Sequence, residues 1–353
     1  MQNVLRNVWY AAAWSCDLIV GKMVDRTILD VRVVLFRTAA GTPAALSNMC
    51  PHRFVPLSMG KLCNAGSTIE CAYHGLRFDA FGACIGNPQG NVPRGARVRA
   101  FPVAECYSAI WIWMGDPDLA NASLIPSIDF LMPEDWAVGT GVSVVRSDYQ
   151  LETDNIMDLS HIEFLHPMFS SEAVRSGKME SRQEGDTVWS RRMIYNDDPP
   201  EFIRKAFQIP AGKRVDRWLD VRWNAPAIMA LWTGGVETGR PRAEGIDWRS
   251  AHFFTPVDAN TTLYFWAISF SRAVDGSEQL AMESRDALRY PFENEDTPVI
   301  EAAHANMRGR EFWSLQPLIL RGDGGSIRAR RLLQSMIARE RGETPTASAV
   351  PLD

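Results

Sequence analysis

Two short stretches, Cys50-Pro51-His52 and Cys71-Ala72-Tyr73-His74, decide how the first part of this 353-residue chain folds. Each stretch offers one thiolate and one imidazole. This is the ligand set of a 2Fe-2S cluster that is held by Cys on one iron and by His on the other. Because four ligands must surround two irons, two loops have to converge from neighbouring hairpins. We expect Cys50 and Cys71 to bind one iron, and His52 and His74 to bind the other.

Structural zinc is the alternative for this ligand set, since two Cys and two His also form tetrahedral sites. Zinc fingers usually place the His pair together after the Cys pair, whereas each loop here mixes the two types. Pro51 stiffens the first loop, and Gly75 leaves room for a tight turn in the second. The pattern therefore favours the cluster.

The other cysteines have no His at ligand spacing and are not counted as ligands: Cys16, Cys63, Cys84 and Cys106.

A second motif, Asp158-Leu159-Ser160-His161 followed by His166, offers two imidazoles to a single metal ion. Apolar residues recur every three to four positions between Asp148 and His166, which predicts a helix that ends at Pro167. Since His161 and His166 are five positions apart, a bulge or the helix end must bring the two rings together. Asp158 is placed either to bind the metal or to accept a hydrogen bond.

The third metal ligand is expected in the acidic segment 292–301. A non-haem Fe(II) oxygenase uses two His and one carboxylate on one face of the iron and leaves the other positions open. We favour Asp296, which precedes a helix that begins near Thr297. The alternatives in the same segment are Glu293, Glu295 and Glu301.

The composition is that of an ordinary soluble globular protein, with 46% hydrophobic and 22% charged residues. A net charge of -5 lacks the basic footprint of a nucleic-acid-binding protein. The first residues contain no apolar signal core, and no stretch approaches the ~20 apolar residues of a membrane span. We expect a cytoplasmic protein that has no nucleic-acid or membrane partner.

The order of predicted elements indicates an α+β protein with two domains. Short β-rich runs, of which Thr27–Phe36 is the first, extend to about Trp113 and predict an all-β domain. A turn-rich segment then places the boundary after residue 118, which gives domains 1–118 and 119–353. The second domain is mixed, with strands expected at 187–195, 227–232, 250–255 and 261–269 and helices at 278–289, 297–310 and 326–341. The segment after them is expected to fray.

Together these motifs resemble the Rieske non-haem iron oxygenases, in the branch of vanillate demethylase, dicamba monooxygenase and toluenesulfonate methyl-monooxygenase. The resemblance spans nearly the whole chain. It implies a Rieske 2Fe-2S domain followed by a catalytic domain of the helix-grip type, in which helices cover an antiparallel sheet as in StAR-related lipid-transfer domains. The segments that carry it are 6–13, 50–53, 73–76, 110–113, 115–117, 154–161 and 215–218.

The same resemblance implies roles for several residues. The assembly would be a homotrimer in which the cluster of one subunit serves the mononuclear iron of the next. Asp158 would relay electrons by accepting hydrogen bonds from His74 of one subunit and His161 of its neighbour. Asn155 would lie beside the iron, and Asp296 would complete the iron site. Electrons would come from NADH through a separate flavin and iron-sulfur reductase, with O2 as the co-substrate.

The substrate implied by the branch is a small aromatic acid. The leading expectation is O-demethylation of a methoxybenzoate with release of formaldehyde, followed by hydroxylation of an aromatic methyl group or of the ring. A Rieske electron carrier is a distant third, because it would need neither His161 nor His166. Dicamba monooxygenase has an Asn that contacts the substrate carboxylate where this chain carries Leu231, which puts that mode of recognition in question. The candidate pocket residues are His252, the best polar one, with Trp232, Met229, Leu231 and Trp266.

Overall fold

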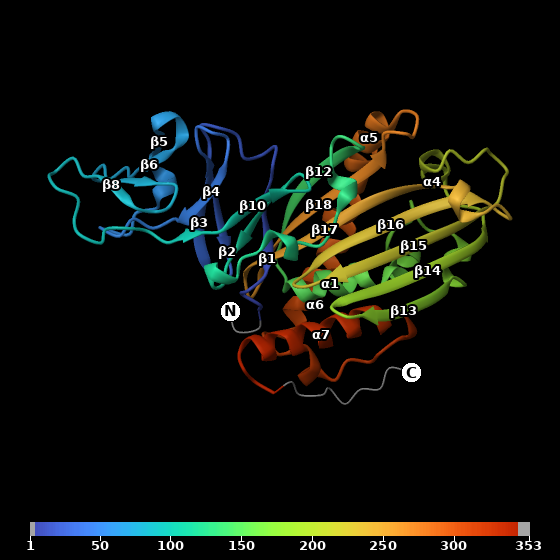
Figure 1. The fold of residues 1–353 in the computed structure, drawn as a ribbon. Helices are drawn as coiled ribbons and strands as arrows, with labels where there is room; N and C mark the ends of the chain where they lie inside the picture. The colour runs from blue at the N-terminus through green and yellow to red at the C-terminus, as the bar shows by residue number, and fades with distance from the viewer. Residues whose placement is uncertain (1–3, 345–353) are drawn as a thin grey trace. The chain divides into compact units, whose positions relative to one another are not determined.

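The computed structural model describes residues 4–344 (Figure 1), and the expected fraying of the C-terminal segment concerns residues outside this range. The chain forms two compact units, one that ends at Ile125 and also includes residues 255–259, and one that begins at Pro126. The sequence-based boundary falls earlier, after residue 118. The short 3₁₀ turns Pro117–Leu119 and Ala122–Leu124 stay with the first unit, where Trp9 Nε1 donates to Asn121 O at 2.8 Å.

Three small antiparallel sheets make up the first unit, and together with the large sheet described below they confirm the α+β class. Strands β1 and β11 are buried at every position, and Cys50 and Cys71 belong to a hydrophobic core with Phe36 and Phe78. The sheets are β1 (Trp9–Trp14), β11 (Ala109–Trp113) and β10 (Val103–Cys106); β2 (Met23–Ile28), β3 (Val31–Arg37), β4 (Pro43–Ser47) and β9 (Ala100–Phe101); and β5 (Lys61–Cys63), β6 (Thr68–Glu70), β7 (Arg77–Asp79) and β8 (Cys84–Gly86).

The expectation of one strand over Thr27–Phe36 is wrong. The segment contains the hairpin between β2 and β3, in which Ile28 pairs with Val31 across the two-residue turn Leu29-Asp30. Both turn residues have positive φ, 52° and 65°. This turn geometry matches the twist of paired strands. The turn is hidden in the sequence because Leu29 is itself apolar and buried.

The second unit is a seven-stranded sheet with helices packed against it (Figure 1). Its strand order is β12 (Trp136–Val145), β18 (Thr261–Ser271), β17 (Ile246–Asp258), β16 (Ile228–Glu237), β15 (Val215–Asn224), β14 (Thr187–Asp197) and β13 (Lys178–Glu184). Helix α5 (Ser277–Pro291) packs on β12 and β18, while α7 (Gly324–Glu340) packs on β13, β14 and α1 (Tyr149–Met157). The three expected C-terminal helices are confirmed as α5, α6 (Thr297–Met307) and α7. Short helices α3 (Glu172–Arg175) and α4 (Glu201–Ala206) complete the unit.

The segment between Asp148 and His166 is not one helix. Helix α1 (Tyr149–Met157) ends at Asp158, whose backbone leaves the helical region at φ -120° and ψ 93°. A 3₁₀ turn (Leu159–His161) and the short α2 (Ile162–Leu165) follow. A π-helical turn is present instead at Phe292–Asp296, between α5 and α6. Within residues 4–344, no helix combines the length and the apolar character that crossing a membrane requires.

Candidate metal centres and the adjoining pocket

The two Cys/His loops have matching backbone hydrogen bonds. In the first, Cys50 N donates to Val55 O at 2.9 Å, and Phe54 N donates to Cys50 O at 2.9 Å. The second loop repeats both bonds, from Cys71 N to Leu76 O at 2.8 Å and from Gly75 N to Cys71 O at 3.0 Å. The residue that closes each turn has a left-handed backbone, with φ of 62° and 73° respectively. Each loop thus holds its Cys and its His in a tight turn.

The four side chains suit an iron-sulfur cluster. Cys50 and Cys71 are buried next to each other, and burial raises the pKa of the Cys50 thiol, so a metal is needed to hold it as the thiolate. The rings of His52 and His74 lie 4.5 Å apart between centroids. Nδ1 of His74 is buried without a hydrogen-bond partner among the described residues, which suits an atom that binds a metal.

A single zinc ion suits the same residues less well. One tetrahedral ion would draw two thiolates and two imidazoles into one compact group. Within residues 4–344, the one compact group of three or more His, Cys, Asp or Glu ligand atoms lies elsewhere, at His161, His166 and Asp296. The Cys/His set is spread more widely, as two irons require.

The structure brings His161, His166 and Asp296 together, with their ligand atoms within 4.8 Å of one another. Nε2 of His166 lies 3.1 Å from Asp296 Oδ1, and Nε2 of His161 lies 3.6 Å from the same oxygen. The break after α1 makes the five-residue His spacing possible, because His161 ends the 3₁₀ turn and His166 follows α2. Two imidazoles and one carboxylate that converge in this way match the ligand set of a mononuclear iron site.

Hydrogen bonds to the outer ring nitrogens fix the orientation of both imidazoles. His161 Nδ1 lies 2.8 Å from the backbone carbonyl of Asp158, and His166 Nδ1 lies 2.7 Å from Glu295 Oε2. If each Nδ1 donates to its oxygen, each Nε2 is left with the lone pair that a metal needs. Asn155 Nδ2 donates to Asp296 Oδ1 at 3.0 Å, so the expected neighbour of the iron adjoins the carboxylate.

The three alternative acids have other partners. Glu295 contacts His166 and was missed as an orienting group, because sequence alone does not reveal the π-helical turn that carries it. Glu293 accepts a hydrogen bond from Ser143 Oγ at 3.0 Å. Glu301 accepts from the backbone N and from Nη2 of Arg146, at 2.9 and 2.8 Å. Asp296 is the acid of this segment that belongs to the compact group.

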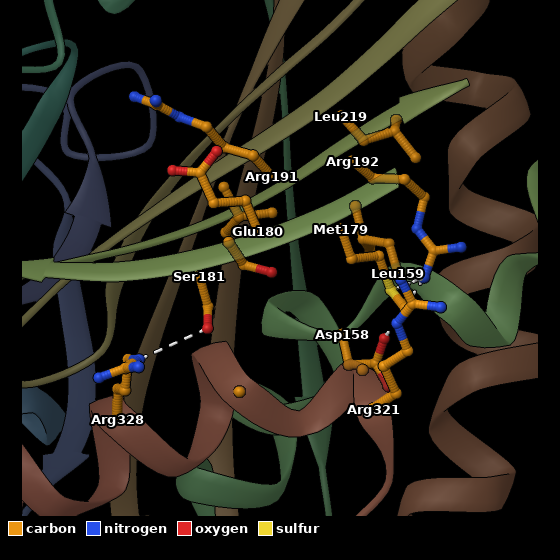
Figure 2. Close-up of a pocket in the computed structure, with 14 residues that line it drawn as sticks. Asp158, Leu159, Met179, Glu180, Ser181, Arg191, Arg192, Leu219, Arg321 and Arg328 are labelled. Carbon is orange, nitrogen blue, oxygen red and sulfur yellow. Dashed lines mark hydrogen bonds and ion pairs between the residues drawn. The ribbon is translucent and has the colours of Figure 1, made fainter. Parts of the chain in front are cut away.

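Asp158 lies in a groove of about 340 Å³ that is rich in arginine (Figure 2). Its carboxylate accepts from Ser160 N and Ser160 Oγ, both at 2.9 Å, and lies 3.9 Å from Nη2 of Arg192. A Cβ on Gly322 would come within 2.5 Å of this carboxylate, so a larger residue there would require the Asp158 side chain to shift. Within the chain His161 contacts the backbone carbonyl of Asp158, whereas the expectation placed it on the carboxylate. The arginines lining the groove are Arg191, Arg192, Arg321 and Arg328.

A mostly apolar pocket adjoins the three grouped residues and Asn155. Of the residues expected to contact substrate, His252 and Leu231 line it. The expectation for Trp232 requires correction. Because side chains alternate along a strand, Leu231 and Thr233 of β16 face the pocket, whereas Trp232 packs on Phe130 and Trp189. Met229 and Trp266 are also not among the lining residues.

Both parts of the chain match known protein families. Residues 8–102 match the Rieske [2Fe-2S] domain, and residues 145–339 match the vanillate O-demethylase oxygenase C-terminal domain. The chain is 35% identical to the oxygenase component of chloroacetanilide N-alkylformylase from Rhizorhabdus wittichii, over 95% of this chain and 96% of that protein. It is 33% identical to the oxygenase component of dicamba O-demethylase from Stenotrophomonas maltophilia, over 94% of this chain and 97% of that protein.

Solved structures of dicamba monooxygenase are similar to this chain over nearly its whole length. The crystal structure of dicamba monooxygenase bound to dicamba is similar with a TM-score of 0.86 and 32% identity, covering 96% of this chain and 99% of that one. A second, with non-haem iron and dicamba, has a TM-score of 0.79 and 31% identity over the same shares of the two chains.

Proposed function

Since this chain belongs to the Rieske oxygenases of the vanillate O-demethylase family, we propose that it is a terminal oxygenase component that demethylates a small methoxy-substituted aromatic compound. The methoxybenzoate expected from the sequence is one member of this substrate class. The observation that carries the proposal is the convergence of His161, His166 and Asp296 at one end of an apolar pocket. A hydrophobic pocket beside an open metal site is the arrangement that oxidation of an unactivated methyl group requires.

Members of this family are enzymes with a Rieske 2Fe-2S cluster and a mononuclear non-haem iron. When bound, the cluster supplies single electrons and the mononuclear iron supplies the activation of O2. We assign Cys50, His52, Cys71 and His74 to the cluster. We assign His161, His166 and Asp296 to the mononuclear iron. The unpartnered Nδ1 of His74 and the compact carboxylate-imidazole group support these assignments.

The chain's own residues prepare the second site in two ways. Glu295 and the backbone carbonyl of Asp158 hold the two imidazole rings with Nε2 towards Asp296. The apolar side chains of the pocket exclude water and leave the methyl group of a bound substrate beside the metal ligands. Asn155 fixes the orientation of the Asp296 carboxylate through its hydrogen bond to Oδ1.

Electrons must reach the cluster from outside the chain. Relatives are named as oxygenase components, which implies a separate reductase. We propose that this partner carries flavin and an iron-sulfur group and oxidises NADH. Around the cluster loops, Met49, Phe54 and Tyr73 are 50%, 69% and 61% exposed. Large exposed apolar side chains at this point suit contact with other proteins.

We further propose a homotrimer in which Asp158 links the iron site of one subunit to His74 of the next. Two features of Asp158 support this link between subunits. Its side chain lies in a surface groove, and its backbone carbonyl holds His161. In solution the mass should be three times the chain mass of 39.5 kDa, as measured by light scattering. A monomer that retains full turnover would exclude electron transfer between subunits.

Hydroxylation of a methyl group on the ring is the second candidate, because the chain is also 30% identical to the iron-sulfur subunit of a toluene-4-sulfonate monooxygenase. Product analysis separates the two. The purified protein is incubated with reductase, NADH and a panel of methoxy- and methyl-substituted aromatic compounds. Formaldehyde identifies demethylation, and a benzylic alcohol identifies methyl hydroxylation. If neither product forms from any compound, the proposed reaction is wrong.

A further inference from the structure

We propose that the pocket beside His161, His166 and Asp296 selects an uncharged substrate, such as a methoxybenzamide, over the corresponding benzoate. This inference rests on the proposed function for the reaction, but it concerns the charge of the substrate alone. The inference is based on how cationic side chains are distributed between this pocket and the groove around Asp158.

The lining of this pocket is dominated by aliphatic and aromatic side chains. They come from α1, α2, α4, α5, β15, β16 and β17, from the 3₁₀ turn Leu159–His161 and the π-helical turn, and, at Phe169, from the segment between α2 and α3. Such walls replace the water around a ligand with groups that form no hydrogen bonds. A carboxylate that loses its water here must find a cation or several donors, because burial of an unpaired charge is strongly unfavourable. The apolar lining residues are Ile156, Leu159, Ile162, Phe169, Ile203, Leu219, Leu231, Trp248, Leu288 and Phe292.

His252 does not supply that cation. Its Nε2 lies 2.9 Å from Ser250 Oγ and its Nδ1 lies 2.6 Å from the Tyr264 hydroxyl, so both ring nitrogens are occupied by hydroxyl groups. The ring is 1% exposed. Burial lowers the pKa of His252 to about 3, which keeps the imidazole neutral at physiological pH. A neutral ring in a hydroxyl network can exchange hydrogen bonds with an amide or an ether but offers no charge to a carboxylate.

Arg217 is the one lysine or arginine among the residues that line this pocket, and its charge is already offset. Arg217 Nη1 donates to Asp197 Oδ2 at 2.7 Å. Both side chains are almost completely buried, at 2% and 1% exposure. A buried pair of this kind is electrically neutral as a unit. A second carboxylate beside it would add a negative charge that the already neutral pair does not balance.

The other hollow makes the contrast clear. Four arginines line the groove around Asp158 (Figure 2). The chain thus places four guanidinium groups in the groove outside the apolar pocket, against two acidic lining residues, Asp158 and Glu180. Position 231 lines the pocket and could carry a polar or cationic side chain. It carries the aliphatic side chain of Leu231. A neutral polar ligand can exchange hydrogen bonds with the hydroxyl network of His252 and leaves no buried charge.

The test uses matched pairs of ligands that differ only in charge, namely 2-, 3- and 4-methoxybenzoate and the corresponding methoxybenzamides. Binding to the holoenzyme is measured by isothermal titration calorimetry, and turnover is measured as formaldehyde release with reductase and NADH. We expect the amide of the best pair to bind at least 10-fold more tightly than its acid. Tighter binding of the acid, or no binding by any of the six compounds, would overturn the inference.

The two readouts separate this inference from the proposed reaction. Amide binding without formaldehyde or any other oxidised product would contradict the proposed function but support the neutral pocket. Formaldehyde released mainly from the acids would support the proposed function but contradict the preference for an uncharged substrate.

A pair of variants tests whether the missing cation in the pocket lining causes the preference for an uncharged ligand. Leu231→Lys adds a cation to the lining and should shift the amide-to-acid binding ratio at least 10-fold towards the acid, whereas Leu231→Met keeps the lining neutral and should leave the ratio unchanged. An unchanged ratio in a folded Leu231→Lys protein would contradict the proposed role of charge. If that variant does not fold, the ligand pairs on the unmodified protein decide the matter.

Discussion

Glu295 Oε2 lies 2.7 Å from His166 Nδ1, while the Nε2 of the same ring lies 3.1 Å from Asp296 Oδ1. Two neighbouring acids on one π-helical turn therefore contact opposite edges of one imidazole. Glu295 orients the ring, and Asp296 faces the place of the metal.

Glu295→Gln should weaken binding of the mononuclear iron by about 10- to 100-fold, because it removes the carboxylate that holds His166 in its ligating orientation. The measurement is Fe(II) titration of protein stripped of mononuclear metal. Glu293→Gln is the matched control, since Glu293 lies on the same turn but contacts Ser143. Equal iron affinity in both variants would remove Glu295 from the site.

The two metal centres should be separable by mutation. His161→Ala should lose mononuclear iron and keep the visible absorption of the cluster, whereas Cys50→Ser should lose the cluster. Cys63→Ser changes a cysteine that we do not count as a ligand and should keep both. Iron content and visible spectra check all three. Loss of both centres in His161→Ala would contradict two independent sites.

Asp158→Asn should leave iron content and the cluster spectrum intact while NADH-coupled turnover falls at least 100-fold. The reason is that the amide keeps the size of the side chain but removes the charge proposed to link two histidines. Glu180→Gln is the control, because Glu180 lines the same groove and undergoes the same change of charge. Turnover of Asp158→Asn within about twofold of the unmodified protein would exclude the relay.

The buried ion pair of Asp197 and Arg217 should matter for stability far more than an exposed one. Asp197→Ala leaves a buried guanidinium unpaired and should lower the free energy of unfolding by about 3–5 kcal/mol. Glu237→Ala removes the partially exposed pair with Lys213, which is 52% exposed, and should cost about 0–1 kcal/mol. Urea unfolding measures both. Similar losses would mean that the buried pair is not stabilised as described.

The pKa of His252 predicts a pH dependence of stability. Burial lowers this pKa from 6.5 to about 3, so between these values the unfolded chain binds a proton that the folded chain does not. His252 therefore destabilises the fold as pH falls from about 6.5 towards 3. His252→Gln should lose less unfolding free energy between pH 7 and pH 5 than the unmodified protein does. Urea unfolding at the two pH values checks this, and equal losses in the two proteins would contradict it.

The Cys/His ligand set of the cluster could be predicted from the sequence because the spacing within each motif is local. Cys50, His52, Cys71 and His74 are close in sequence, and each pair lies in one tight turn. Asp296 was harder to identify, since it stands among four acids and its convergence with His161 depends on the path of the whole sheet. Glu295 could be identified as an orienting group only from the structure.

Three strands of the large sheet were not predicted, for different physical reasons. β15 buries the charged residues Arg217 and Asp220, so its sequence lacks the apolar pattern that predicts a buried strand. β13 (Lys178–Glu184) is an edge strand with mostly polar residues. β12 contains two glycines, Gly139 and Gly141, that interrupt its apolar pattern, and a Cβ on Gly141 would meet the Trp266 ring at 2.1 Å. Each strand is specified by its neighbours in space.

The central claim is that the His161 site uses O2 and reductase-supplied electrons to remove a methyl group. The most direct test records O2 consumption and formaldehyde release together, with reductase, NADH and the best methoxy-aromatic ligand, in the unmodified protein and in His161→Ala. We predict one formaldehyde for each O2 consumed in the unmodified protein and none from the variant. Formaldehyde release that continues without O2, or at the same rate in His161→Ala, would contradict the account.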